Sequence, residues 1–66
     1  MQNRLKIERA ELNLTQDDLA QKIGVSRQTI NSIEKSRYVP STILALKLSE
    51  VFNKPVNDIF KLDKSD

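Results

Sequence analysis

The chain has 66 residues, 38% of them hydrophobic, a net charge of +2, and neither cysteine nor histidine. This length predicts one domain with one small core and no separate sensor or catalytic domain. Without histidine or cysteine, catalytic triads, thiol nucleophiles and the usual zinc sites are excluded, and no glycine-rich phosphate loop is present, so we expect no enzyme, no metal and no cofactor.

The remaining composition indicates a helical protein. One glycine and two prolines stand among many Leu, Ile, Lys and Glu residues, and the alternating pattern of strands is missing. The charged start, MQNRLKIERAE, predicts neither a signal peptide nor a membrane span, and the absence of cysteine is expected of a cytoplasmic protein. No pattern indicates a small-molecule ligand.

The first predicted helix runs from about Asn3 to Leu12. Asn13 can adopt the left-handed conformation that ends a helix. Leu5, Arg9 and Leu12 share one face of this helix. Ile7 and Ala10 lie on nearly the opposite side, which could pack on the C-terminal segment or on a partner subunit.

Two short amphipathic helices follow, joined by a tight turn. The second helix is predicted to start at Thr15, which with Asp18 forms a variant of the capping box, and to end at Gly24. The third is capped by Ser26 and runs to about Lys35. Leu19, Ala20 and Ile23 on one helix and Ile30 and Ile33 on the other form their apolar sides.

The second half of the chain predicts a loop over residues 36–40 and two more helices. Ser41 caps a fourth helix that runs through Phe52 and ends at Asn53. This helix is expected to be the most buried, because its apolar residues are Ile43, Leu44, Ala45, Leu48, Val51 and Phe52.

The C-terminal segment begins with Pro55, which starts a short fifth helix over residues 56–60. Residues 61–66 are polar and expected to be frayed, except that Leu62 could anchor a short extended segment against the N-terminus. Surplus apolar surface marks candidate dimer contacts, which could alternatively complete the core of the monomer. These candidates are Ile7, Ala10, Val56, Ile59 and Phe60.

Charge is unevenly distributed along the chain. Residues 19–49 contain five cations and one acid, Glu34, whereas the flanks contain six cations and eight acids. The middle is therefore +4 and the flanks −2, which places positive potential on the third predicted helix.

The third helix also has a polar outward face. Gln28, Asn31, Ser32 and Lys35 are spaced at i, i+3, i+4 and i+7, so they project together. A stripe of amides, a hydroxyl and a cation suits the base edges and phosphates of a DNA major groove. The alternative interpretation is a helical hairpin with no role in DNA binding.

The segment QDDLAQKIGVSRQTINSIEK, residues 16–35, resembles the helix-turn-helix of the phage Cro and repressor type, the XRE family. The matching positions are Gln16, Ala20, Gly24, Ile30 and Ile33. A small residue is needed where the two helices cross, a glycine permits the left-handed turn, and the two isoleucines hold the second helix on the first.

The resemblance covers nearly the whole chain and implies its fold. It implies an all-α, five-helix bundle of the lambda-repressor type, in which the termini can pair as two short strands. Residues 1–62 would form the DNA-binding domain, with the motif at 16–35, and residues 63–66 a short polar tail. Many members of the family are homodimers, so the implied partners are double-stranded DNA and a second copy of the chain, with no membrane.

Roles for individual residues follow from the same resemblance and from side-chain chemistry. The residues expected to read bases are Arg27, Gln28, Asn31 and Ser32. Those expected to bind phosphates are Gln16, Thr29, Lys35, Arg37 and Tyr38. Arg9 and Glu34 occupy positions that often form an ion pair in the family, and we expect this pair to be structural.

These observations favour a sequence-specific transcriptional regulator, most simply a repressor that binds a palindromic or pseudo-palindromic operator as a homodimer through the major groove. One alternative is an antitoxin or another protein-interaction module built on the same helices. Antitoxins usually add a disordered tail, whereas only about six residues follow the last helix here. A monomeric nucleic-acid chaperone would need a stronger and more diffuse basic surface.

Overall fold

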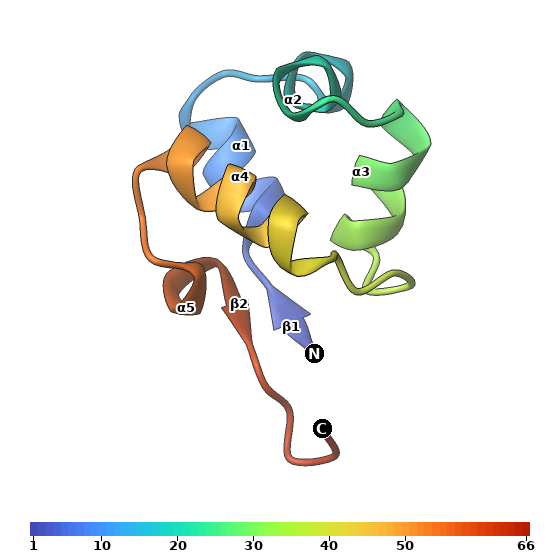
Figure 1. Cartoon of the computed structure of the whole chain (residues 1–66), viewed down its shortest axis with the longest axis vertical. Coiled ribbons are helices and arrows are strands. Elements are labelled where there is room, and N and C mark those ends of the chain that lie inside the picture. Colours follow the sequence, from blue (N-terminus) through green and yellow to red (C-terminus); the bar gives the residue numbers. More distant parts are fainter.

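The computed structural model describes residues 1–66 and contains five helices and one pair of strands (Figure 1). In chain order the elements are β1 (Gln2–Asn3), α1 (Leu5–Glu11), α2 (Gln16–Ile23), α3 (Arg27–Glu34), α4 (Thr42–Phe52), α5 (Val56–Ile59) and β2 (Phe60–Lys61). The all-α, five-helix architecture predicted from the sequence is confirmed. None of the helices is long and apolar enough to cross a membrane.

Hydroxyl side chains start the three longest helices, as predicted. The Thr15 hydroxyl accepts from the Asp18 backbone N–H at 3.0 Å, and the Asp18 carboxylate accepts from the Thr15 N–H at 2.9 Å, which completes a capping box. The Ser26 hydroxyl likewise accepts from the Thr29 backbone N–H, and the Ser41 hydroxyl from the Leu44 backbone N–H. Each cap satisfies a backbone N–H that the helix itself leaves without a partner.

Four helices end at a residue in the left-handed conformation. Asn13 (φ 56°), Gly24 (φ 75°) and Asn53 (φ 53°) were predicted, whereas Ser36 (φ 59°) was not. At the end of α3 the Ser36 and Arg37 N–H groups each donate to a carbonyl of the last turn, at 2.9 Å in both cases. This turn directs the chain out of α3 and into the loop over residues 36–40.

The core lies where α2, α3 and α4 meet α1 and α5. Its fully buried large side chains are Leu5, Leu19, Ile30, Ile33, Leu48 and Ile59. Ala20 is 1% exposed and belongs to α2, the helix that packs most extensively on α3. A larger side chain there would push the two helices apart, so the small residue fixes their spacing.

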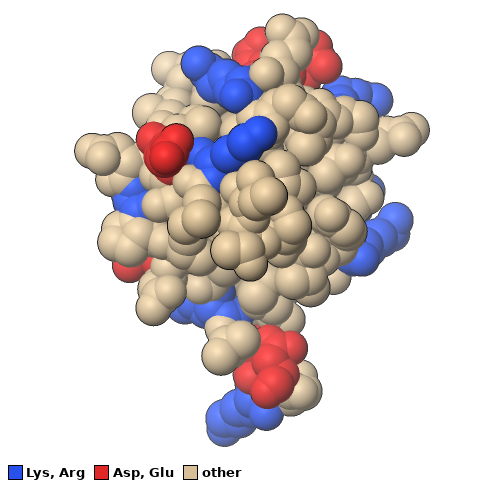
Figure 2. Space-filling model, in the orientation of Figure 1, with Lys and Arg blue, Asp and Glu red and all other residues tan.

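The expectation that α4 is the most buried helix is wrong. Only Leu48 and Phe52 of this helix are buried, while Ile43 is 67% and Leu46 55% exposed. The core of so short a chain covers one stripe of α4, and apolar residues outside that stripe stay on the surface. Figure 2 accordingly shows no charged side chain over the N-terminal half of α4.

The termini pair as predicted, but through a different residue. β1 and β2 are antiparallel, with Asn3 opposite Phe60. Phe60 is 8% exposed and makes the apolar contact, whereas Leu62 is 79% exposed, because it lies beyond the strand where no helix covers it. Ile59 and Phe60, candidate dimer contacts by sequence, therefore belong to the core of the monomer.

Two further boundaries differ from the predictions. Helix α1 starts at Leu5 rather than Asn3, because Asn3 is in β1 and its side-chain oxygen accepts from the Leu5 N–H at 3.1 Å. The tail expected to be frayed folds into a turn. Its Asp63 and Asp66 carboxylates lie 2.9 and 3.2 Å from the Met1 amino group.

An ion pair between Arg9 and Glu34 joins α1 to α3. The Arg9 Nε donates to Glu34 Oε2 at 2.8 Å and a second guanidinium nitrogen to Oε1 at 3.2 Å, while a third donates to the Leu14 carbonyl at 2.8 Å. The two side chains are only 16% and 6% exposed. Hydrogen bonding by the Glu34 carboxylate raises the pKa of Arg9 further above its usual value, against the effect of burial.

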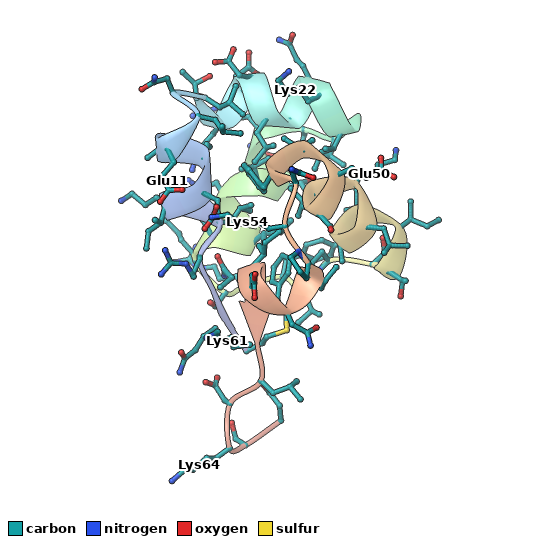
Figure 3. All side chains as sticks on the ribbon, turned by 90° about the vertical axis from the view of Figure 1, so that its left-hand side faces the viewer. Glu11, Lys22, Glu50, Lys54, Lys61 and Lys64 are labelled. Atoms are coloured by element: carbon teal, nitrogen blue, oxygen red, sulfur yellow. The ribbon has the colours of Figure 1, made fainter.

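A second buried acid, Glu8, was not predicted. Its side chain is 3% exposed and accepts from Lys54 Nζ at 2.6 Å and from Arg4 Nε at 3.5 Å. Figure 3 shows Lys54 reaching toward α1, where Glu11 is also 3.6 Å away. The hydrogen bond from Lys54 lowers the pKa of Glu8 below its ordinary value, although burial opposes the shift.

Glu8 should make the fold acid-sensitive. Because its folded pKa is depressed, its stabilising effect is complete above the ordinary value of 4.5 and is lost as the pH falls through the lower folded value. We expect Glu8→Gln to lower the melting temperature at about pH 6 and to flatten its decline toward about pH 3. Thermal unfolding followed by circular dichroism measures both. Glu11→Gln, at a 55% exposed partner of the same lysine, is the matched control, and an equal effect there would contradict the assignment.

Removing one partner of the Arg9–Glu34 pair should be much more damaging. Arg9→Met leaves the Glu34 charge buried without its partner, and we expect a loss of about 3–5 kcal/mol in the free energy of unfolding. Urea denaturation measures the loss. Arg4→Met, at a 48% exposed arginine whose pair distance is 3.5 Å, should lose less than about 1 kcal/mol.

A double variant separates pairing from packing. Replacing both partners, Arg9→Met with Glu34→Leu, removes the unpaired charge and should recover most of the stability lost in Arg9→Met. A single variant as stable as the control would show that the pair is not a structural constraint.

Candidate nucleic-acid interface

Helix α3 buries one side and exposes the other. Ile30 and Ile33 are 0% and 1% exposed and pack into the core. The opposite face carries a shallow surface depression lined only by polar side chains, namely Arg27, Gln28, Asn31 and Ser32. These are the four residues that the sequence predicts to read bases, and the fold brings them together on one surface.

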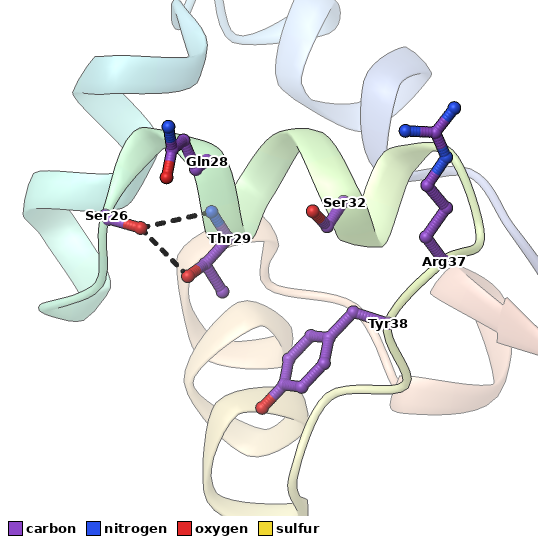
Figure 4. A pocket seen from close by; sticks show the side chains of 6 residues that line it. All are labelled: Ser26, Gln28, Thr29, Ser32, Arg37 and Tyr38. Atoms are coloured by element: carbon purple, nitrogen blue, oxygen red, sulfur yellow. Dashed lines mark hydrogen bonds between the residues drawn. The ribbon is translucent and has the colours of Figure 1, made fainter.

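A second depression adjoins the first and extends to the loop after α3 (Figure 4). Its lining residues are Ser26, Gln28, Thr29, Ser32, Arg37 and Tyr38. Gln28 and Ser32 line both depressions, so the two form one continuous surface, here called the reading surface. Arg37 and Tyr38 reach it because the left-handed turn at Ser36 folds the loop back along α3.

The remaining predicted phosphate contacts have different positions. The Thr29 hydroxyl lies 3.0 Å from the Ser26 hydroxyl, so it shares in the helix cap while still lining the reading surface (Figure 4). Lys35 is exposed at the C-terminal end of α3 but lines neither depression. Positive charge is nonetheless present along the side of the molecule formed by α3 and its following loop. Figure 2 shows basic side chains there, at the right-hand edge.

Gln16 makes contacts that were not predicted. Its side-chain NH₂ donates to Glu34 Oε1 at 3.2 Å, and its side-chain oxygen accepts from the Asn31 NH₂ at 3.4 Å. The side chain therefore bridges the buried ion pair and the reading surface. A sequence signal for this contact exists, because Asn31 and Glu34 are one turn apart on α3 and both face the start of α2.

The chemistry of this surface is that of recognition rather than catalysis. It offers amide donors and acceptors, hydroxyls and two guanidinium groups, and it contains no acid. Glu34, the one acid on α3, turns inward and is neutralised by Arg9. No group of three acidic, histidine or cysteine side chains converges to hold a metal ion.

Comparison with known proteins agrees with this geometry. A family model described as Helix-turn-helix matches residues 5–59. A protein of Methanocaldococcus jannaschii, named as an uncharacterised HTH-type transcriptional regulator, is 57% identical over 60 residues, or 91% of each chain. The similarly named YgzD of Bacillus subtilis is 41% identical over 66 residues and is covered, like this chain, at 100%.

A solved structure supports the same assignment. The solution structure of the SOS-response transcriptional repressor LexA from Eubacterium rectale has a TM-score of 0.80 and is 31% identical in sequence. The similarity covers 94% of this chain and 66% of that one. The chain therefore belongs to the XRE-type helix-turn-helix family of DNA-binding transcriptional regulators, which is not a family of enzymes.

Proposed function

We propose that this protein is a repressor that binds a palindromic or pseudo-palindromic operator as a homodimer, with α3 in the major groove. The observation that carries the proposal is the reading surface, on which Arg27, Gln28, Asn31 and Ser32 line one depression. Residues 1–66 form one set of packed helices, and such a domain, bound to promoter DNA in the cytoplasm, would repress by blocking access to the promoter.

The first turn of α3 carries the two strongest base readers. Arg27 and Gln28 are both exposed, and neither side chain has a hydrogen-bond partner within the protein. A guanidinium can donate two hydrogen bonds to guanine O6 and N7, and an amide can pair with adenine N6 and N7. The N-terminal turn of a recognition helix is the part that reaches base edges.

The surrounding residues fit phosphate contacts, which give affinity without sequence information. Three exposed residues follow α3: Lys35 at the end of the helix, and Arg37 and Tyr38 in the loop after it. The Thr29 hydroxyl and the start of α2 at Gln16 flank the same surface and add neutral donors. Cations at these positions should dominate the salt dependence of binding.

An apolar groove beside the reading surface supports a second copy of the chain as the partner. Its lining residues are Met1, Val39, Pro40, Thr42, Ala45, Leu46, Val56 and Phe60. Val39, in the loop, is 66% exposed and Leu46, in α4, is 55% exposed. Ile43, which is also in α4, is 67% exposed. We call this groove with Ile43 the α4 face. The groove contains no charged side chain, and the one charge among its residues, the Met1 amino group, is paired with Asp63 and Asp66, so two copies can meet there with little repulsion.

The position of the α4 face also suits a two-fold operator. Val39 directly follows Tyr38, so the apolar groove adjoins the reading surface. Equivalent residues of two copies related by a two-fold axis are separated by twice their distance from that axis, and in a domain that measures 32 × 22 × 20 Å this separation can reach the long dimension of the molecule. This separation is comparable with the roughly 34 Å between successive major grooves on one side of DNA.

Two arginine variants separate base reading from phosphate binding. Arg27→Ala should lose about 1–3 kcal/mol of discrimination at one base pair in each half-site. Arg37→Ala should instead weaken all duplexes alike and reduce the slope of log K against log salt by about 1 per protomer. Selection on randomised duplexes, followed by anisotropy titrations at several salt concentrations, measures both effects.

The same titrations can reject the proposal. A wild-type protein that enriches no sequence, and whose binding follows ionic strength alone, is not a specific regulator. Loss of sequence preference in Arg37→Ala but not in Arg27→Ala would reverse the two roles.

The oligomeric state tests the dimer separately. Leu46→Asp places a charge in the α4 face and should convert the dimer to a monomer, because burying an unpaired carboxylate is strongly unfavourable. Leu62→Asp, at an apolar residue that is 79% exposed on the C-terminal tail, should leave the dimer intact. Sedimentation velocity distinguishes the species. A wild-type monomer at all concentrations excludes the dimer, and a dimeric Leu46→Asp protein excludes this face.

A further inference from the structure

A line of hydrogen bonds leads from the buried ion pair to the reading surface. Glu34 Oε1 accepts from the Gln16 side chain at 3.2 Å, and the Gln16 oxygen accepts from the Asn31 side chain at 3.4 Å. The line starts at a side chain that is 6% exposed and ends at a half-buried one on the reading surface. It thus connects the scaffold of the fold to a residue that faces outward.

The direction of these hydrogen bonds is dictated by the charge at the buried end. An ionised carboxylate only accepts hydrogen bonds, so Gln16 must turn its NH₂ group toward Glu34. Its oxygen then faces Asn31, which must answer with its own NH₂ group. Rotating either amide by half a turn would bring two acceptors or two donors together in a partly buried place, which is unfavourable.

These hydrogen bonds determine which atoms of the Asn31 amide remain free to contact DNA. Its side-chain oxygen has no partner within the protein, and one N–H hydrogen of the NH₂ group remains. An adenine edge in the major groove offers a donor, N6–H, next to an acceptor, N7, and an asparagine amide can pair with both. A guanine edge offers only acceptors there, which an outward-facing amide oxygen opposes.

We propose that Glu34, acting through Gln16, fixes the orientation of the Asn31 amide and thereby makes Asn31 a reader of adenine that rejects guanine. Gln16 and Glu34 are positioning residues in this scheme. The inference rests on the proposed function, since it concerns base reading by α3. A preset amide also loses less rotational freedom when DNA binds, which favours the correct base further.

The variant Gln16→Ala tests the proposal without disturbing the ion pair. Asn31→Ala first identifies the base pair that Asn31 reads, by a loss of about tenfold or more in discrimination there. Gln16→Ala should remove most of the discrimination at that same base pair and leave the preference set by Arg27 unchanged. The double variant should lose little more than Asn31→Ala alone, because the two residues act as one unit.

Two further variants show whether the effect of Gln16→Ala comes from its contacts with Glu34 and Asn31. Gln21→Ala removes another glutamine of α2, one whose amide bonds only the exposed Asp17, and should leave sequence preference unchanged. Glu34→Gln supplies a side chain that can donate as well as accept, so both amides can rotate and guanine should be tolerated at the Asn31 position. If that variant unfolds, Gln16→Ala decides alone, because it keeps the Arg9–Glu34 pair.

A measurement on the free protein is independent of DNA. The two side-chain NH₂ hydrogens of Asn31 should give separate NMR signals, one shifted by its bond to Gln16, and the separation should shrink in Gln16→Ala but not in Gln21→Ala. If Gln16→Ala instead weakens all duplexes equally, Gln16 only binds phosphate, and the inference fails while the proposed function stands. A wild-type protein without sequence preference would overturn both.

Discussion

The buried pair between Arg9 and Glu34 is the constraint on which the other features depend. It joins α1 to α3 through two hydrogen bonds, and Arg9 also holds the Leu14 carbonyl in the segment before α2. Helix α3 is thereby held against α1 and the segment before α2, although Glu34 is 25 residues away from Arg9 along the chain. Because burying either charge alone is costly, the pair tolerates few other geometries, and the orientation of α3 relative to α1 follows from it.

The same pair determines the electrostatics of the reading surface. Glu34 is the only acid between Leu19 and Ser49, and on the surface it would repel phosphate. Turned inward against Arg9, it leaves a reading surface that carries amides, hydroxyls and guanidinium groups only. Glu34 thus anchors α3 to α1. Because its carboxylate lies inside the protein, it does not repel phosphates from the reading surface.

The small size of the chain explains the apolar surface that remains. A core that closes around Leu48 and Phe52 cannot also cover the outer side of α4, so Ile43 and Leu46 stay exposed beside a groove that has no charged side chains. In a larger domain another layer would bury such residues. Here a second copy of the chain can do so, which would relate folding stability to the two-fold symmetry of an operator.

Local sequence was sufficient for the motif and its boundaries. Thr15, Ser26 and Ser41 cap helices, and Asn13, Gly24 and Asn53 end them, because each of these effects involves only backbone groups within a few residues. The spacing of Ile30 and Ile33 likewise identifies the buried side of α3. The family resemblance was needed to select the four side chains that share its outward depression.

Which polar groups meet, and which apolar side chains stay exposed, depends on how the helices pack together. The burial of Glu8 depends on Lys54, which is 46 residues away along the chain, and the bridge through Gln16 depends on how α2 packs on α3. The exposure of Ile43 and Leu62 depends on which surfaces the core can cover. The periodicity of a sequence indicates which side of a helix is apolar and which is polar. A contact between distant residues depends instead on how the helices pack against one another, which local sequence does not specify.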